Sequence, residues 1–305
     1  MSEKVLINDV GPRDGLQNQA KTLTPEERLQ MIRALVGTGL QEIEVGSFVH
    51  PKAVPAMANT DQVIAALPNT QNVAFNALIP NRKGYDLAQQ TGIKTLNLVT
   101  AASNTMNEKN IGMNNAEVMA VCQEVIQQAK KDNVKTMAYI AVSWECPFEG
   151  ATDPQVVEDT AADLFKTGAD RVVIADTIGA ADPAGVESLM TRLDKEFTLD
   201  NISAHFHDTR GMGLANVLAA YKVGTRKFDA SIGGLGGCPF APGATGNVAT
   251  EDVALMFAKM GIETGINLEK LIKAVDVTKE LTGSCNGGHS YRWMALQLEK
   301  GKPLH

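Results

Sequence analysis

One pattern repeats along the whole chain: a short run of β-branched and other apolar residues, a polar loop, and then an amphipathic stretch with helical spacing. It predicts eight strands, at residues 5–8, 42–46, 73–78, 95–99, 136–142, 171–176, 202–207 and 228–231. Helices are predicted between them, and a further pair at about 251–260 and 268–281 follows the last strand. Alternating strands and helices of this number favour an α/β fold, a closed (β/α)8 TIM barrel with extra C-terminal helices.

The competing architecture is an open, doubly wound parallel sheet. It is less favoured because no GxGxxG turn follows the first predicted strand. No linker rich in proline, glycine or serine divides the sequence either. We therefore expect a single TIM-barrel domain over residues 1–305, with the barrel at about 5–260 and a C-terminal helical extension at about 261–305.

Composition narrows the class of partner. The chain has 28 lysines and arginines against 35 aspartates and glutamates, a formal net charge of −7, so a general nucleic-acid-binding surface is not expected. The N-terminal apolar run is too short for a signal peptide, and no apolar run has the length needed to cross a membrane. The four cysteines form no CxxC pair, which favours a reducing, cytoplasmic setting.

The unusual polar residues follow the predicted strands, where the catalytic groups of a barrel are expected. His205 and His207 are the most distinctive pair, because residues two apart on a strand point to the same face. Both imidazoles could therefore bind one ion inside the barrel mouth. The alternative is that they are hydrogen-bonded core histidines, and their spacing alone does not separate the two interpretations.

Asp14 and Asn247 favour the metal site, since each would supply an oxygen from a neighbouring strand end once the barrel closes. Two imidazoles, a carboxylate and an amide oxygen suit Mg2+ or Mn2+ and tolerate Zn2+ or Co2+. Such a set leaves coordination positions open for a chelating substrate.

Other residues at this rim are candidates for catalysis. Arg13 could form a solvent-facing salt bridge or stabilise negative charge on a thioester oxygen. Cys238, in a glycine-rich stretch, could be an inert cysteine or a general acid on a mobile loop. Glu44 and Asp176 could cap loops, but we expect both to point inward beside the cation, which favours orienting or acid–base roles.

Several motifs together resemble the 3-hydroxy-3-methylglutaryl-CoA lyase family of metal-dependent TIM-barrel lyases and synthases. The most specific is the stretch 231–240, which contains Cys238 and follows the family's active-site signature. Residues 10–18, 205–209 and 246–252 also match family motifs, and the similarity covers about residues 8–281. The loop after the fifth strand departs from the pattern at Ala141, Val142 and Glu145, where the acyl part of the substrate would lie.

The resemblance implies that Asp14, His205, His207 and Asn247 bind the cation. It implies that Arg13 supports an enolate and that Cys238 lies on the loop that closes over the substrate. The implied reaction is a retro-Claisen cleavage of 3-hydroxy-3-methylglutaryl-CoA, or a close branched 3-hydroxyacyl-CoA, to acetyl-CoA and acetoacetate. His205 and Asp176 are both candidates for the base.

The resemblance also implies an acyl-CoA partner and a homo-oligomer, a dimer or a tetramer. Lys109 and Asn110, in the loop after the fourth strand, are candidates to contact CoA. One alternative function is a Claisen-type synthase of the same superfamily, resembling isopropylmalate or homocitrate synthase. It is less favoured because the sequence stops at His305 without a long regulatory domain. A non-catalytic protein that binds metal or CoA is a further alternative.

Overall fold

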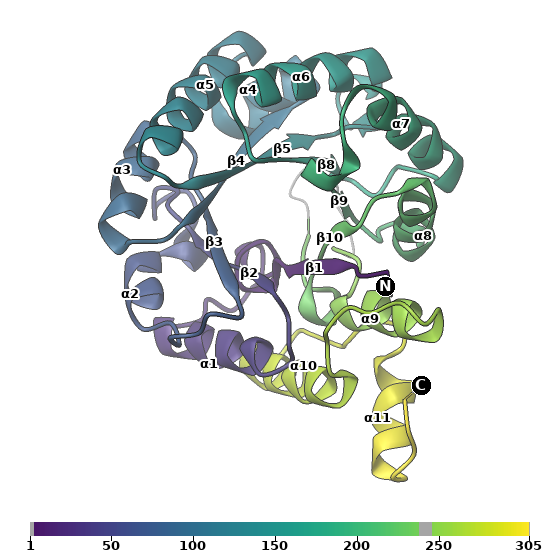
Figure 1. Ribbon diagram of the computed structural model, residues 1–305. Helices are drawn as coiled ribbons and strands as arrows, with labels where there is room; N and C mark the ends of the chain where they lie inside the picture. The colour runs from purple at the N-terminus through teal and green to yellow at the C-terminus, as the bar shows by residue number, and fades with distance from the viewer. Residues whose placement is uncertain (1–2, 238–245, 305) are drawn as a thin grey trace.

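Eight parallel strands close into a barrel in the order β1-β10-β9-β8-β5-β4-β3-β2 (Figure 1). The structure is a computed structural model and describes residues 3–237 and 246–304. The (β/α)8 barrel is thus confirmed, and the open sheet is excluded because the strand order closes on itself, with β1 joining β10 and β2. The barrel strands are β1 (Leu6–Asp9), β2 (Glu42–Ser47), β3 (Ala74–Leu78), β4 (Thr95–Ala101), β5 (Lys135–Ala141), β8 (Arg171–Asp176), β9 (Ile202–Phe206) and β10 (Lys227–Ala230).

Helices surround the barrel and mostly start at residues that satisfy their first backbone N–H groups. Thr24 forms a capping box with Glu27, and Asp182 accepts from the backbone N–H groups of Ala184 and Gly185. The helices are α1 (Pro25–Val36), α2 (Thr60–Ala65), α3 (Arg82–Thr91), α4 (Asn104–Ile111), α5 (Asn115–Lys131), α6 (Pro154–Thr167), α7 (Pro183–Glu196), α8 (Gly213–Val223), α9 (Thr250–Lys259), α10 (Leu268–Thr282) and α11 (Tyr291–Glu299).

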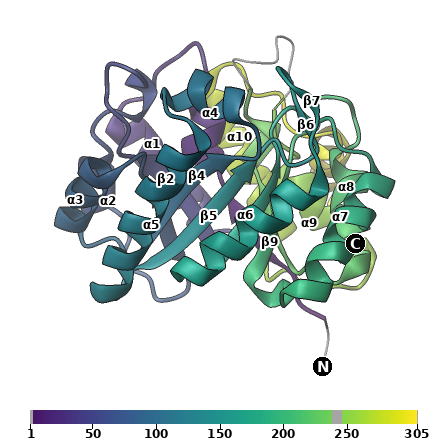
Figure 2. The same ribbon diagram turned by 90° about the horizontal axis from the view of Figure 1, so that it is seen from above.

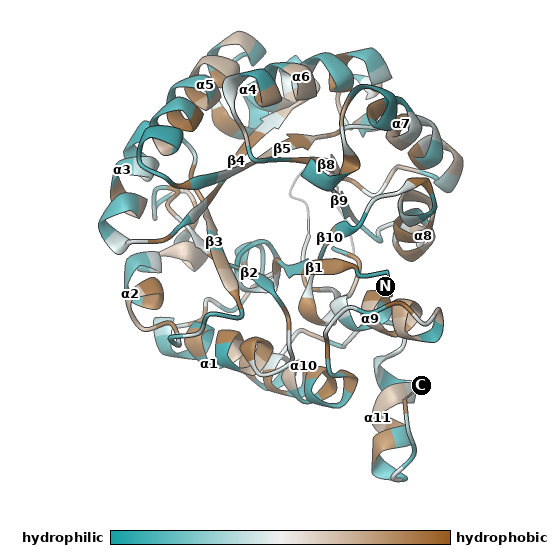
Figure 3. Cartoon of the chain, viewed as in Figure 1, coloured by the Kyte–Doolittle hydropathy of each residue, from teal (hydrophilic) through white to brown (hydrophobic). Residues whose placement is uncertain are grey.

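The strands have an apolar outer face and a largely polar inner face. Outward residues such as Ile7, Ile174 and Phe206 belong to one large buried cluster between strands and helices, here called the outer core. Figure 3 shows how hydrophobic and hydrophilic residues share each helix of the surrounding ring. Inside the barrel lies a separate small apolar cluster formed by Met137, Tyr139 and Val173. Val99 packs against it, and Ala101 and Ala141 belong to another apolar cluster at the ends of β4 and β5. The inward residues of β1, β9 and β10 include the polar Asn8, His205 and Asp229, which lie beneath the barrel mouth.

The loops after strands four and five contain secondary structure that the sequence reading missed. Residues 103–110, expected as a loop, form most of helix α4 and its N-cap, because the side chain of Ser103 accepts from the backbone N–H of Met106. A hairpin of β6 (Glu145–Cys146) and β7 (Gly150–Ala151) follows β5. Figure 2 shows α4 and this hairpin on the side of the barrel opposite the N-terminus.

The C-terminal segment packs against the barrel. Helix α10 contacts α1 and completes the ring of helices, while α11 packs through Met294 onto Ile272 of α10 (Figure 1). Between these helices, the backbone N–H groups of Gly288 and His289 donate to the carboxylates of Glu251 and Asp252. The tail therefore lies over the start of α9, next to the loop that follows β10.

Candidate metal centre and active site

Three of the predicted metal-binding side chains come together at the barrel mouth. Ligand atoms of Asp14, His205 and His207 all lie within 4.8 Å of one another. Asp14 belongs to a short π-helix, η1 (Gly11–Gly15), just after β1, whereas His205 is the last residue but one of β9 and His207 follows the strand. Closure of the barrel brings these segments together although about 190 residues separate them in sequence.

Asn247, the fourth predicted ligand, lies against the same cluster. Its Nδ2 donates to Asp14 Oδ2 at 2.8 Å and to the carbonyl oxygen of Leu235 at 3.0 Å. Among the described residues, its Oδ1 and the Nδ1 of His207 are buried without a hydrogen-bond partner. Buried polar atoms normally have partners, so these two fit a site that a cation would complete.

The charges at the cluster suit a divalent cation. Burial raises the pKa of Asp14, but the charges of Arg13, His205 and His207 outweigh it and lower that pKa to about 2. Burial and the neighbouring His205 lower the pKa of His207 to about 4. At neutral pH the site therefore contains an ionised carboxylate and a neutral imidazole, the forms that bind metals.

His205 is held in place by a carboxylate that the sequence reading missed. Its Nδ1 lies 3.1 Å from Oδ2 of Asp229, and that oxygen also accepts from the hydroxyl of Tyr139 at 2.8 Å. Burial alone would lower the pKa of His205, but Asp229 and Asp14 outweigh it and raise that pKa. A carboxylate behind one ring nitrogen leaves the other nitrogen, Nε2, to face a ligand.

Arg13 is buried, which excludes the solvent-facing salt bridge. Its Nε donates to Glu44 Oε2 and its Nη1 to Asp14 Oδ1, both at 2.8 Å. Within the described part of the chain, its Nη2 makes no hydrogen bond. Glu44 lies inside the barrel and accepts a second hydrogen bond, from Nδ2 of Asn97. Glu44 is thus placed to orient Arg13. The Nη2 donors of Arg13 stay available for a ligand.

Asp176 is placed differently from the others. Its side chain has the same strand parity as Val172 and Ile174, which belong to the outer core, so it does not point into the barrel as expected. Its two oxygens accept from the backbone N–H groups of Ala180 and Ala181, in the loop after β8. Burial raises the pKa of Asp176 to about 6. The contacts are those of a loop-capping carboxylate, and its role as a base stays a prediction.

Cys238 lies outside the described residues, but the start of its loop does not. The backbone N–H of Gly233 donates to Glu251 Oε2 at 3.0 Å, and the other oxygen of Glu251 accepts from Gly288. Cys285 packs against the same glycine and takes the space that a side chain at position 233 would need. The tail thus holds the base of the glycine-rich loop. Cys122 and Cys146 are buried, as expected for core cysteines.

The candidate CoA contacts lie on a helix rather than in a loop. Lys109 and Asn110 are exposed in the last turns of α4, on the rim that carries the metal cluster. Arg82, another basic residue of this rim, forms ion pairs with Asp86 and Glu124. No helix within the described residues is long and apolar enough to cross a membrane.

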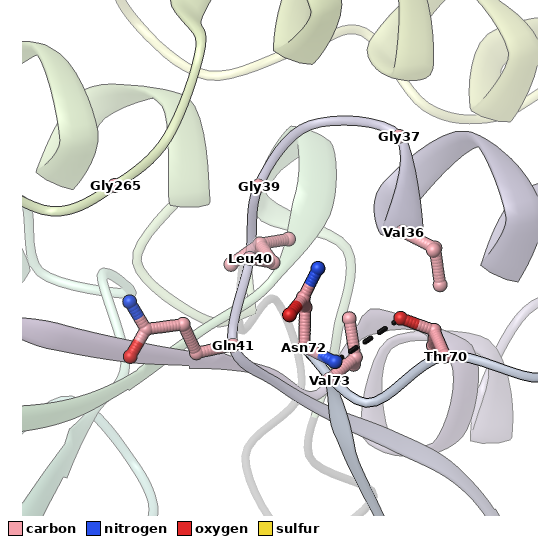
Figure 4. A pocket seen from close by; sticks show the side chains of 9 residues that line it. All are labelled: Val36, Gly37, Gly39, Leu40, Gln41, Thr70, Asn72, Val73 and Gly265. Carbon is pink, nitrogen blue, oxygen red and sulfur yellow. Dashed lines mark hydrogen bonds between the residues drawn. The ribbon is translucent and has the colours of Figure 1, made fainter.

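A surface pocket marks the opposite end of the barrel. It lies where β2 and β3 begin and is lined by Gln41, Asn72, Gly265 and neighbouring residues, without an acidic, basic or histidine side chain (Figure 4). This pocket therefore has no side chain suited to metal binding or acid–base catalysis.

Comparisons with known proteins agree with this geometry. The hydroxymethylglutaryl-CoA lyase YngG of Bacillus subtilis is 41% identical over 281 residues, 92% of this chain and 94% of the relative. The (R)-citramalyl-CoA lyase of Chloroflexus aurantiacus is 39% identical over 90% of both chains. A crystal structure of hydroxymethylglutaryl-CoA lyase from Pseudomonas aeruginosa superposes with a TM-score of 0.94 at 35% identity, over 97% of this chain and 99% of that one. The sequence model of the family described as HMGL-like matches residues 4–278, and the chain belongs to this family.

Proposed function

We propose that this protein cleaves a carbon–carbon bond of 3-hydroxy-3-methylglutaryl-CoA, releasing acetyl-CoA and acetoacetate, with the help of a divalent cation. The proposal rests above all on the cluster of Asp14 with the buried His205 and His207, in which Arg13 is bonded to Asp14. Its relatives are named as lyases of branched hydroxyacyl-CoA thioesters, which favours cleavage over condensation or simple binding.

Asp14, His205, His207 and Asn247 would bind the cation. Their oxygen and nitrogen donors, without a thiolate, suit Mg2+ or Mn2+. A bound cation would polarise the tertiary hydroxyl of the substrate and lower its pKa. The two buried atoms without partners, His207 Nδ1 and Asn247 Oδ1, support this assignment.

Arg13 would stabilise the enolate of acetyl-CoA that leaves when the bond breaks. Glu44 and Asp14 hold the Nε and Nη1 groups of its guanidinium. The Nη2 donors point to no partner in the described residues and are available for a thioester oxygen. A buried, permanently charged group that does not have to move stabilises such a developing charge strongly.

Two proton transfers remain. A base removes the proton of the tertiary hydroxyl, and His205 and Asp176 stay the two candidates. His205 would have to act with its Nε2 off the cation, because its Nδ1 faces Asp229, and Asp176 would have to act while it accepts from Ala180 and Ala181. Cys238 would then protonate the enolate carbon when its loop covers the site. Attachment of this loop to Glu251 and the tail supports a loop whose base is fixed.

A second candidate substrate is citramalyl-CoA, favoured by the 39% identity to a lyase named for it. This thioester lacks one methylene between the carbinol carbon and the free carboxylate. A pocket discriminates such a pair by about 10–200-fold. We propose that the loop after β5, which departs from the family pattern, would make this choice; in it Val142 has a left-handed conformation (φ 53°).

One experiment tests the proposal. The purified protein is incubated separately with 3-hydroxy-3-methylglutaryl-CoA and with citramalyl-CoA, with Mn2+ and with EDTA, and acetyl-CoA is quantified. We expect metal-dependent acetyl-CoA release, faster from the first thioester. Consumption of neither thioester under any metal would refute the assigned function.

The proposal also covers the domain organisation, the CoA contacts, the location and the assembly of the protein. We propose a single domain, supported by an outer core that runs from Val5 to Cys285. Lys109 and Asn110 would contact CoA from α4. A cytoplasmic location stays a prediction. A homo-oligomer, dimer or tetramer, also stays a prediction, supported by the outward residues of α8, which include Ala215 and only one charged side chain, Lys222.

A further inference from the structure

Three buried asparagines form a chain of hydrogen bonds across the inside of the barrel. Asn8 on β1, Asn76 on β3 and Asn97 on β4 are each at most 1% exposed. Nδ2 of Asn97 donates to Oδ1 of Asn76 at 2.7 Å, and Nδ2 of Asn76 donates to Oδ1 of Asn8 at 3.0 Å. Both amide-to-amide hydrogen bonds of this asparagine chain therefore run from Asn97 toward Asn8.

Each end of the asparagine chain is hydrogen-bonded to a carboxylate. At one end, Nδ2 of Asn8 donates to Oδ1 of Asp229 at 2.9 Å, and the other oxygen of Asp229 faces His205. At the other end, Asn97 donates to Oε1 of Glu44 at 2.8 Å, and the other oxygen of Glu44 accepts from Arg13. Each carboxylate therefore has one oxygen on the asparagine chain and the other on a side chain of the active site.

Two acceptors at the ends determine the orientation of every amide between them. Asn97 uses both protons of its Nδ2 group, one for Glu44 and one for Asn76. A flip of any of these side chains would place a carbonyl oxygen against another oxygen. The low local dielectric strengthens each bond of this buried network, and of its amide oxygens only Oδ1 of Asn97 is buried without a partner among the described residues.

We propose that Asn76 and Asn97 are positioning residues that hold the metal-binding side of the site and the Arg13 side in a fixed relation. The inference rests on the proposed function, because it assigns His205 to the cation and Arg13 to the enolate. Among the described residues, Asn76 bonds only to other asparagines. Any effect of Asn76 on His205 or on Arg13 must therefore pass through the asparagine chain.

Asn76→Leu tests the proposal, because it removes the middle link while keeping a buried side chain of similar size. We expect about tenfold weaker Mn2+ binding by isothermal titration calorimetry, since Asp229 and His205 lose a support. We also expect kcat to fall at least about tenfold, since Glu44 and Arg13 lose the support that the asparagine chain gives them. The metal-binding readout does not depend on turnover.

Thr38→Val is the matched control. It removes a buried hydroxyl that makes two hydrogen bonds, to Leu35 and Leu40, in the turn before β2 at the opposite end of the barrel. We expect the control to retain both Mn2+ affinity and kcat. If Asn76→Leu behaves like the control, or loses only one of the two properties, the coupling is refuted. If the wild-type protein itself shows no turnover, the proposed function fails instead.

Asn76→Asp keeps the test valid if the leucine variant does not fold. A carboxyl group at this position can accept from Asn97, but it can donate to Asn8 only while it is protonated. Glu44 and Asp229 at the two ends disfavour its ionised form. We expect kcat relative to the wild type to fall as pH rises. A pH profile parallel to that of the wild type would overturn the proposal.

Discussion

Replacing Glu44 with glutamine removes the charge opposite Arg13 at nearly constant volume. The side chain of Glu44 is fully buried, and that of Arg13 is 9% exposed. Glu44 accepts two hydrogen bonds of 2.8 Å, from Arg13 and from Asn97. A hydrogen bond to a charged group contributes about 1.5–3 kcal/mol. Because Asp14 still neutralises Arg13 in the variant, we expect the free energy of unfolding to fall by about 2–4 kcal/mol.

Glu42→Gln provides the matched control for this substitution. Glu42 lies two residues earlier on the same face of β2 and accepts from both terminal nitrogens of Arg171, at 2.6 and 2.8 Å. This pair lies at the far end of the barrel from the metal cluster. We expect Glu42→Gln to lower stability as well, but to leave kcat unchanged.

The two variants are compared by urea denaturation of the metal-free protein and by acetyl-CoA release. Glu44→Gln should lower both the free energy of unfolding and kcat, the latter by at least about tenfold because Arg13 loses its orientation. If Glu44→Gln lowers the free energy of unfolding by less than about 1 kcal/mol, the loss expected for a buried charged pair is refuted. Equal kcat values in the two variants would refute the role of Glu44 in orienting Arg13.

The remaining predictions concern the metal site and its loop. Cys238→Ala should lose most turnover and keep Mn2+ affinity, whereas His207→Ala should lose both; equal affinity in the two variants, measured by calorimetry, would reverse these assignments. Protons compete with the cation for His205, whose pKa is raised, so Mn2+ affinity should weaken as pH falls from about 8 to 5. Asp229→Asn removes the main charge that raises this pKa and should move that loss to lower pH; an unchanged profile would exclude Asp229 as the cause.

Much of the fold and part of the site could be predicted without coordinates. Strand and helix periodicities are local properties, and a barrel gathers its strand ends at one rim, so Asp14, His205 and His207 could be expected together. The orientation of Asp176 was predicted wrongly, since the carboxylate stands on the outer face of β8 and caps a loop. Helix α4 was also missed, because its start depends on a side-chain cap at Ser103 within a short polar stretch.

The sequence alone determined the strand–helix alternation and the residue types available at the barrel mouth, because both follow from spacing along the chain. Only the tertiary structure decided the partner of each buried polar side chain. Asn8 and Asp229 are 221 residues apart, and their hydrogen bond exists because closure of the barrel makes β1 and β10 neighbours. No local pattern specifies such a pair. The connection between His205 and Arg13 is therefore a property of the closed barrel.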